Sequence, residues 1–181
     1  MYLSSQHGTG KMFCLDGSLL EGQWAHGHME GSGKTTAADG AVYEGQFKTS
    51  LRHGEGTLAF ANGDSYTGQW QAGNKHGDGA FLWAATGASY KGQFMFGVVH
   101  GSGTCRFPDG SSYSGEYRDA KRHGRGTYRS TEGKEHSGRW EMGRIADNRG
   151  APLSQRQLSQ RDGEMGRDTS PYAKYTDAFE A

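Results

Sequence analysis

The sequence predicts an all-β repeat protein built of stacked β-hairpins. The segment Tyr-Thr-Gly-Gln-Trp, which begins at Tyr66, recurs in related form along the chain in steps of 23 or 24 residues. Self-similarity at a fixed period of this length is the signature of a repeat array. Within each copy apolar and polar residues alternate, which indicates half-buried strands. Between copies lie Asp-Gly or Asn-Gly pairs, such as Asn62-Gly63, which are typical of tight turns.

The chain contains five full copies and a half copy at each end. The full copies span 20–42, 43–65, 66–89, 90–112 and 113–135, and the whole array spans 7–145. The opening position of successive copies is held by Leu20, Tyr43, Tyr66, Tyr90, Tyr113 and His136. An aromatic residue follows four positions later, at Trp24, Phe47, Trp70, Phe94, Tyr117 and Trp140. A His-Gly-x-Gly element begins ten positions after the opening, at His53, His76, His100 and His123.

Each copy is expected to form one hairpin. The first strand holds the opening aromatic residue, and the period of two places Tyr66 and Trp70 on one face. The second strand carries apolar residues at alternate positions, such as Phe81 and Trp83. The third copy is one residue longer than the others, so we expect a bulge or a longer turn between 79 and 87.

A glycine lies midway between the two aromatic residues of every copy, as Gly68 does between Tyr66 and Trp70. Glycine inside a strand is unfavourable and usually marks the close approach of another group. We therefore expect the aromatic ring of a neighbouring copy to lie flat across each of these glycines.

The pattern Tyr-x-Gly-x-Trp-x-x-Gly-x-x-His-Gly-x-Gly, closed by Asp-Gly or Asn-Gly, resembles the MORN repeat (membrane occupation and recognition nexus) over residues 7–145. The resemblance implies an elongated, single-layer antiparallel sheet of stacked hairpins, curved into a groove. A narrower likeness to small MORN proteins of cilia, flagella and male germ cells implies a cytoskeletal or ciliary setting. The departures from the pattern are Leu20 and His136 at the opening position, Glu30 at the histidine, and Ser50 and Ala120 at the fourth glycine.

The composition changes beyond the array. Residues 146–169 are polar with almost nothing apolar, which predicts a flexible linker. In 170–181 a Ser-Pro start is followed by Tyr172, Tyr175 and Phe179 at helical spacing, which predicts a short helix. A helix of this length needs a surface to dock on, and we expect either the chain's own aromatic groove or a partner.

The charges balance at 20 basic and 20 acidic residues, so nothing favours nucleic acid as a partner. The two cysteines, Cys14 and Cys105, are far apart in sequence, which fits a reducing compartment. No signal peptide and no apolar run of membrane-spanning length is found. These features predict a cytoplasmic protein, either free or attached to the cytoskeleton.

No cofactor, metal or catalytic site is expected, and we predict a protein that is not an enzyme. The segment 28–35 resembles a phosphate-binding loop, but His28 replaces its first glycine and a turn follows where a helix is needed. The histidines of successive copies should lie ~10 Å apart, too far to share a zinc ion. We expect each histidine to donate a hydrogen bond to a loop carbonyl. No nucleophile motif is present.

Two surfaces remain for partners. The first is the partner groove, whose aromatic residues we expect to be partly exposed: Trp24, Tyr43, Phe47, Tyr66, Trp70, Tyr90, Phe94, Tyr113, Tyr117 and Trp140. The second is a basic patch for anionic lipid: Arg118, Lys121, Arg122, Arg125 and Arg129.

The first hypothesis is a scaffold or adaptor whose groove binds a helical segment of another protein. The alternative is a peripheral membrane module that binds anionic phospholipid. A homodimer is left open.

Overall fold

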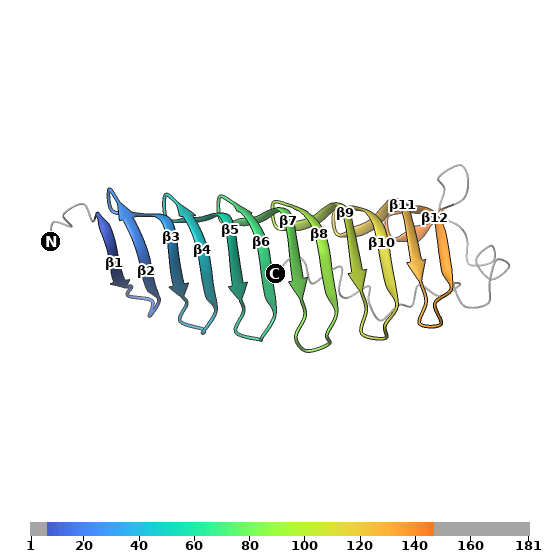
Figure 1. Ribbon diagram of the computed structural model, residues 1–181, viewed down its shortest axis with the longest axis horizontal. Helices are drawn as coiled ribbons and strands as arrows, with labels where there is room; N and C mark the ends of the chain where they lie inside the picture. The colour runs from blue at the N-terminus through green and yellow to red at the C-terminus, as the bar shows by residue number, and fades with distance from the viewer. Residues whose placement is uncertain (1–6, 147–181) are drawn as a thin grey trace. The chain divides into compact units, whose positions relative to one another are not determined.

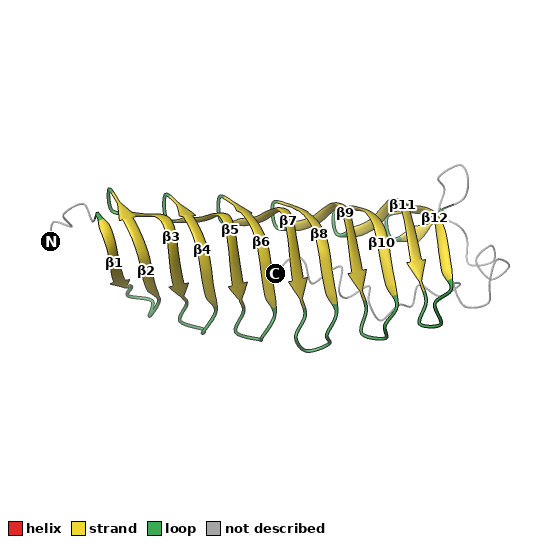
Figure 2. Ribbon diagram, in the orientation of Figure 1, coloured by secondary structure: helices red, strands yellow, loops and turns green. Residues whose placement is uncertain are grey.

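The computed structural model describes residues 7–146, which form thirteen β-strands and no helix (Figures 1 and 2). The predicted all-β fold is confirmed. The predicted helix over 170–181 and, beyond Ala146, the predicted linker lie outside the described residues. The chain divides into two units, one up to Gly87 and one from Ala88 onward.

The first unit contains seven strands: β1 (Gly8–Phe13), β2 (Leu19–Ala25), β3 (His28–Thr36), β4 (Val42–Lys48), β5 (Leu51–Ala59), β6 (Ser65–Gln71) and β7 (Asn74–Leu82). The second contains six: β8 (Ser89–Met95), β9 (Val98–Arg106), β10 (Ser112–Arg118), β11 (Lys121–Arg129), β12 (Glu135–Glu141) and β13 (Arg144–Ile145). Within each unit every strand pairs antiparallel with the next in chain order, which gives a single-layer sheet.

A two-residue turn closes each hairpin. Between β6 and β7, Ala72 and Gly73 have φ of 48° and 85°, the left-handed backbone that twisted hairpins require. Ser50 and Ala120, which replace the expected glycine, adopt the same conformation with φ of 63° and 59°. In all of these hairpins the second turn residue donates its N–H to a carbonyl of the preceding hairpin, as Gly73 does to Arg52 at 2.9 Å. This bond compensates the unfavourable backbone of Ser50 and Ala120, whose N–H groups bond in the same way.

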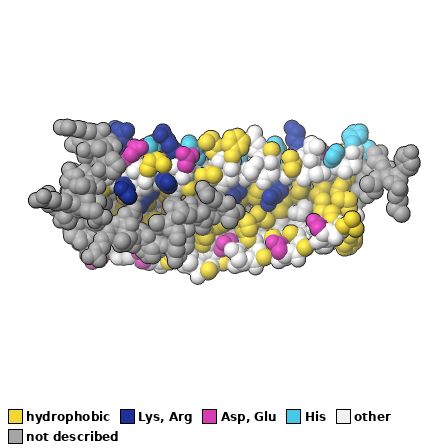
Figure 3. All heavy atoms as spheres, turned by 180° about the vertical axis from the view of Figure 1, so that it is seen from behind, with side chains coloured by type: hydrophobic (Ala, Val, Ile, Leu, Met, Phe, Trp, Pro, Cys, Tyr) yellow, Lys and Arg dark blue, Asp and Glu magenta, His cyan; other side chains and the backbone are white. Residues whose placement is uncertain are grey.

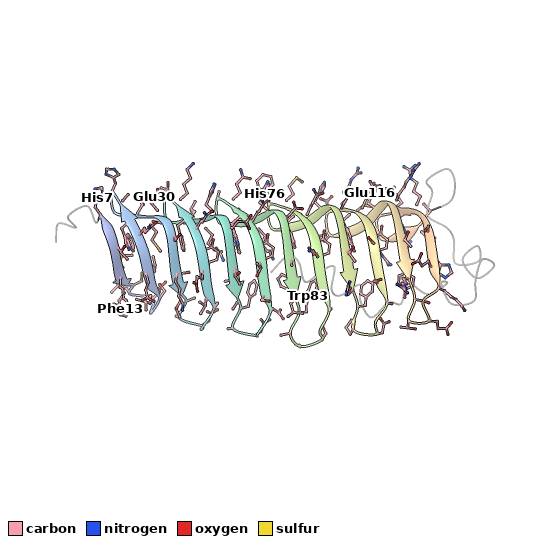
Figure 4. All side chains as sticks on the ribbon, in the orientation of Figure 1. His7, Phe13, Glu30, His76, Trp83 and Glu116 are labelled. Carbon is pink, nitrogen blue, oxygen red and sulfur yellow. The ribbon has the colours of Figure 1, made fainter. Side chains whose placement is uncertain are left out.

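At the opposite edge a longer turn joins successive hairpins. In the second copy the turn is closed by a bond from Gly63 N to Phe60 O at 3.0 Å. In the third copy Gly87 N bonds to Trp83 O at 2.8 Å, one residue further along. The extra residue therefore lengthens this turn, which is one of the two outcomes expected from the sequence. In the first unit Glu30 and His76 lie at the tight-turn edge and Trp83 at this longer-turn edge (Figure 4).

A bulge interrupts the hairpin of each full copy at the His-Gly-x-Gly element, or at Glu30 and the residues after it in the first copy. In the third copy the register shifts between Gly68 and Trp70, and Gly77 takes a left-handed φ of 57°. The Gln69 side chain reaches across and its Oε1 accepts a hydrogen bond from the Asp78 N–H at 3.1 Å. Without that acceptor the bulge would leave this N–H unpaired.

The same hydrogen bond recurs in the other copies, with distances of 2.9–3.0 Å. The acceptors are Gln23, Gln46, Gln93 and Glu116, and the donors are the N–H groups of Ser32, Glu55, Ser102 and Arg125. We call this contact the bulge clasp. The clasp was not predicted from the sequence.

The opening tyrosine packs on two glycines at once. Gly68 faces Gly79 on the paired strand, and the buried Tyr66 ring lies across both. A Cβ added at Gly79 would lie 2.6 Å from Tyr66 Cε2. The Tyr66 hydroxyl donates to Gln69 O at 2.8 Å, and Tyr43, Tyr90 and Tyr113 donate to the equivalent carbonyl at 2.9–3.3 Å.

This packing corrects the expectation from sequence. The ring over Gly68 belongs to the same copy, not to a neighbouring one. A strand side chain can lean along its own strand, and the two missing Cβ atoms leave the space that allows Tyr66 to do so.

Substitution of Gly68 by Val is expected to destabilise the sheet. The new Cβ would meet Asp78 O and Gly79 Cα at 2.5 Å, and overpacking of this kind costs about 1–3 kcal/mol. The matched control is Gln71→Val, at an exposed position of the same strand. Thermal melts followed by circular dichroism measure the difference, and equal melting temperatures for the two variants would contradict the packing role.

Substitution of Gln69 by Leu is expected to open the bulge clasp. The Asp78 N–H loses its acceptor, which costs about 0.5–1.5 kcal/mol, and its amide should exchange with solvent faster. Gln69→Glu should keep slow exchange, because Glu116 fills this position in the fifth copy. Amide exchange measured by NMR decides between them, and unchanged exchange in Gln69→Leu would count against the clasp.

Candidate partner-binding face

The aromatic residues predicted for the partner groove lie on one face of each sheet, which we call the aromatic face. In the first unit these are Trp24, Tyr43, Phe47, Tyr66 and Trp70, and in the second Tyr90, Phe94, Tyr113, Tyr117 and Trp140. All are buried, with exposed fractions from 0% to 6%. The expectation that they would be partly exposed is therefore wrong.

The rings are buried because they pack edge to face against one another. The Tyr43 ring centroid lies 5.1 Å from that of Phe47 in its own copy and 5.2 Å from that of Trp70 in the next. The interplanar angles are 86° and 83°, the arrangement that ring quadrupoles favour. Tyr43 thus joins two copies through its two neighbours.

The second unit repeats this arrangement with different rings. Tyr90 and Tyr113 both contact Tyr117, with centroids 5.4 Å and 5.3 Å away. Trp140 follows at 5.2 Å from Tyr113. The ladder is therefore built in the same way in both units.

The tryptophan polar groups are not equally satisfied. In the first unit the indole N–H groups of Trp24 and Trp70 donate to Gly10 O and Gly56 O at 3.3 Å and 3.1 Å. In the second unit the buried Trp140 Nε1 and the buried Tyr117 hydroxyl have no hydrogen-bond partner among residues 7–146. Such atoms are uncommon in interiors, and they suit a polar ligand group at this face.

Three cations lie over the aromatic face. Arg52 Cζ is 4.6 Å from the Trp70 ring centroid, and Arg122 Cζ is 4.3 Å from that of Trp140. Lys75 Nζ is 5.0 Å from the Phe81 centroid. These are cation–π distances. Figure 3 shows Lys and Arg side chains set within the hydrophobic band of this face.

The three cations occupy one repeat position, immediately before each histidine. Met29 and Val99 fill the same position in other copies and are fully buried. Arg52 and Lys75 were not predicted as residues of this face. The alternation of the strand contained this information. Counting back in steps of two from the buried Leu58 through Gly56 places Arg52 on the same face.

Burial changes the acidity of groups on this face. Burial lowers the pKa of Arg52, and burial and then the nearby Arg52 charge lower the pKa of Lys75. Burial raises the pKa of Tyr43 to about 12, although the Arg52 charge acts in the opposite direction. Burial is also the main cause that raises the pKa of Tyr113 to about 12.

The predicted basic patch is not one surface. Arg122 lies over Trp140 on the aromatic face and donates to Gly143 O at 3.3 Å. The other four residues, Arg118, Lys121, Arg125 and Arg129, are exposed. Alternation places Arg118 opposite in direction to the buried Tyr117, on the other face of the sheet.

Acidic groups share that outer face. The Glu116 carboxylate accepts the Arg125 N–H at 2.9 Å, and Glu135 faces Arg129 across the paired strands. Assigning Arg122 to the basic patch was wrong, because its closeness in sequence to Lys121 hid the alternation of faces.

The histidines do not follow the predicted role throughout. At His100 and His123 the buried Nδ1 has no hydrogen-bond partner within the described part of the chain. His123 Nδ1 instead lies 3.7 Å from Glu141 Oε1. Within residues 7–146 no group of three or more His, Cys, Asp or Glu side chains is placed to hold a metal ion. The segment 28–35 that resembles a phosphate-binding loop lies in strand β3.

The pattern of tyrosine, paired glycines and clasp is that of a known repeat. The family model for the MORN repeat matches residues 21–42, 43–65, 66–85, 90–112 and 113–135, more than half of the chain. The chain belongs to the MORN repeat family. The resemblance noted in the sequence is confirmed. None of the curated proteins matches this MORN protein in sequence.

Solved structures with a similar fold include two domains from Drosophila melanogaster. One is the TCP domain of SAS-4 (dCPAP) in complex with a proline-rich motif of Ana2 (dSTIL), with 13% identity and a TM-score of 0.44 over 72% of this chain and 77% of that chain. The other is the TCP10c domain of Sas-4, with 14% identity and a TM-score of 0.43 over 73% and 79%. A likeness this distant says nothing about the partners of the MORN array.

Within residues 7–146, no helix is long and apolar enough to cross a bilayer.

Alkaline titration is expected to unfold the array. The folded pKa of Tyr43 and Tyr113 is about 12, above the ordinary value of 10.0. A raised folded pKa gives stability that is fully present below pH 10 and is lost as the pH rises toward 12. Tyrosinate absorbance should therefore rise together with loss of the circular dichroism signal. The chain in urea serves as control and should titrate near 10; ionisation of all tyrosines near 10 in the folded chain would contradict the burial.

Proposed function

We propose that this MORN array is a non-enzymatic scaffold or adaptor whose aromatic face binds a helical segment of a partner protein. The observation that carries the proposal is a sheet face lined with large rings and cations that no second layer covers within the described residues. The rings bury one another, so we expect the partner to contact the assembled layer of rings and cations rather than to fill a gap in it.

The face is well suited to binding because its side chains are already fixed. The ring-to-ring contacts and the tyrosine hydroxyl bonds hold each aromatic group in one position. A preorganised surface loses little side-chain entropy when a partner docks. An amphipathic helix that lays its apolar side on such a surface is a recurrent mode of peptide recognition.

Exposed apolar side chains lie near the tight turns of the second unit, outside the aromatic face. Met95, Phe96 and Met142 have exposed fractions of 42%, 67% and 45%. Met95 alternates with the buried Phe94 and therefore lies on the outer face.

A cytoskeletal or ciliary assembly is the setting we propose, from the narrower family likeness. The alternative, a membrane module for anionic phospholipid, is weakened because Arg122 leaves the basic patch and acidic groups lie among the remaining residues. A homodimer through the aromatic face is one outcome of the test below.

Site-specific photo-crosslinking tests the proposal. A diazirine amino acid replaces Leu58, which lies on the aromatic face beside Tyr43 and Tyr66. The matched control places it at Leu51, which pairs with the exposed Lys48 on the outer face. In extract of the native tissue we expect the Leu58 probe to form cross-links that mass spectrometry maps to one helical segment of a partner.

Cross-links from the Leu51 probe alone would contradict the proposed face. Cross-links from Leu58 to another copy of this chain would indicate the homodimer. Cross-links mainly to lipid, with co-sedimentation on anionic vesicles, would favour the membrane alternative.

A further inference from the structure

Arg52 and Lys75 place two positive charges close together on the aromatic face of the first unit. They fill the same position in successive copies, so their backbones lie about 10 Å apart, two strand spacings. Lys75 has an exposed fraction of 8%, which is unusual for a lysine. Its ammonium is 5.0 Å from the Phe81 ring, and the Arg52 guanidinium is 4.6 Å from the Trp70 ring.

Neither cation has a counter-charge within the described residues. Their side chains make no ion pair and no hydrogen bond there; their recorded contacts are with aromatic rings. The nearest acidic residues in sequence, Glu44, Glu55 and Asp78, are exposed at positions that alternate away from the buried rings. The charges therefore face the surface that the partner is proposed to cover.

Holding these charges on an apolar face works against stability. Burial lowers the pKa of both groups, and the Arg52 charge lowers the pKa of Lys75 further. Apolar residues fit the same position, as Met29 and Val99 do with no exposed surface. Nothing in the packing thus requires a cation here, and buried charges are costly unless paired.

The lysines that form ion pairs in the described chain lie elsewhere. Lys134 pairs with Glu132 at 3.1 Å on an exposed loop, and Lys11 pairs with Glu21. Lys75 differs because it is buried and, within residues 7–146, pairs with no acidic side chain, and the half-buried Arg52 lies beside it on the same face.

We propose that Arg52 and Lys75 form an anion site that binds two carboxylates of an acidic partner segment. The inference rests on the proposed function and adds the charge of the partner. A helix rises 1.5 Å per residue, so two positions about 10 Å apart correspond to acidic residues seven positions apart on one side of the helix. Guanidinium and ammonium groups bind carboxylates through strong, charge-assisted hydrogen bonds.

The recessed position of the cations favours a protein ligand over a membrane surface. Headgroups attract basic side chains that protrude toward the lipid. Lys75 does not protrude, and a side chain that enters between the rings reaches it more easily.

The test uses a synthetic amphipathic helix with two glutamates seven residues apart at the centre of its apolar side. A matched peptide carries glutamine at both positions, and a second keeps both glutamates but places them five residues apart. Isothermal calorimetry with the full chain measures binding. We expect the peptide whose glutamates are seven residues apart to bind at least about tenfold more tightly than either control peptide, because each control loses a charge-assisted hydrogen bond.

Variants of the protein locate the effect. Arg52→Met and Lys75→Met should each weaken binding of the glutamate peptide by about tenfold, and should remove most of the difference in affinity between the glutamate and glutamine peptides. Arg52→Lys and Lys75→Arg keep the charge and should retain most of the affinity. Lys48→Met, at an exposed position on the outer face, is the control. Circular dichroism of every variant checks the fold, and the charge-retaining pair tests the site if a methionine variant is unfolded.

Three outcomes would overturn the inference. If the glutamine peptide binds as tightly as the glutamate peptide, the face binds helices without selecting acid, and the proposed function survives. If no glutamate peptide binds, the anion site is wrong, while the cross-linking experiment still decides the proposed function separately. If vesicles of phosphatidylcholine and phosphatidylserine bind the wild-type protein but not the methionine variants, the site binds lipid headgroups.

Discussion

The contact on which the array depends is a tyrosine ring laid over a pair of glycines on neighbouring strands. Tyr66 covers Gly68 and Gly79, and its hydroxyl closes on Gln69 O. The contact solves a problem of single-layer sheets, in which no second layer buries the apolar face. By leaning flat along the sheet, the ring covers backbone and becomes buried itself. Roughly 1.5–3 kcal/mol per buried ring then accrues in each copy that opens with tyrosine.

Other features follow from this placement. A ring that lies flat exposes its edges to the rings of its own and the next copy, so edge-to-face contacts at 5.1 Å and 5.2 Å extend the face from copy to copy. The paired glycines are also followed by the bulge, where the left-handed Gly77 and the Gln69 clasp satisfy the backbone. One repeat therefore combines a buried ring, a closed bulge and a turn bonded to its neighbour, and none of these is stable alone.

The sequence predicts the strands, the turns and the repeat family, because each depends on local pattern. It does not predict which glycines a ring covers. The repeat spacing is equally compatible with Tyr66 lying over the glycines of its own copy or over those of the next copy. The clasp was overlooked because an exposed Gln69 looks like any polar strand residue, although its recurrence at Gln23, Gln46 and Gln93 was a usable sign. Arg122 was grouped with the basic patch because it lies close to Lys121 in sequence. Counting back in steps of two from Tyr128 through Gly126 instead places Arg122 on the aromatic face.

The repeat separates what holds the sheet together from what the face can recognise. The tyrosine, the two glycines and the clasp vary little within the full copies of this chain, and they account for the packing. The position before the histidine varies between Met29, Arg52, Lys75, Val99 and Arg122, yet the hairpins around it keep the same register. In the copies that open with tyrosine, a side chain there lies against the rings without entering the tyrosine–glycine contact. In the first copy, which opens with Leu20, Met29 Cε itself lies over Gly33. The charge at this position can therefore change from copy to copy at little cost to the stability of the fold. We infer that the charge along this face is determined by what the partner requires.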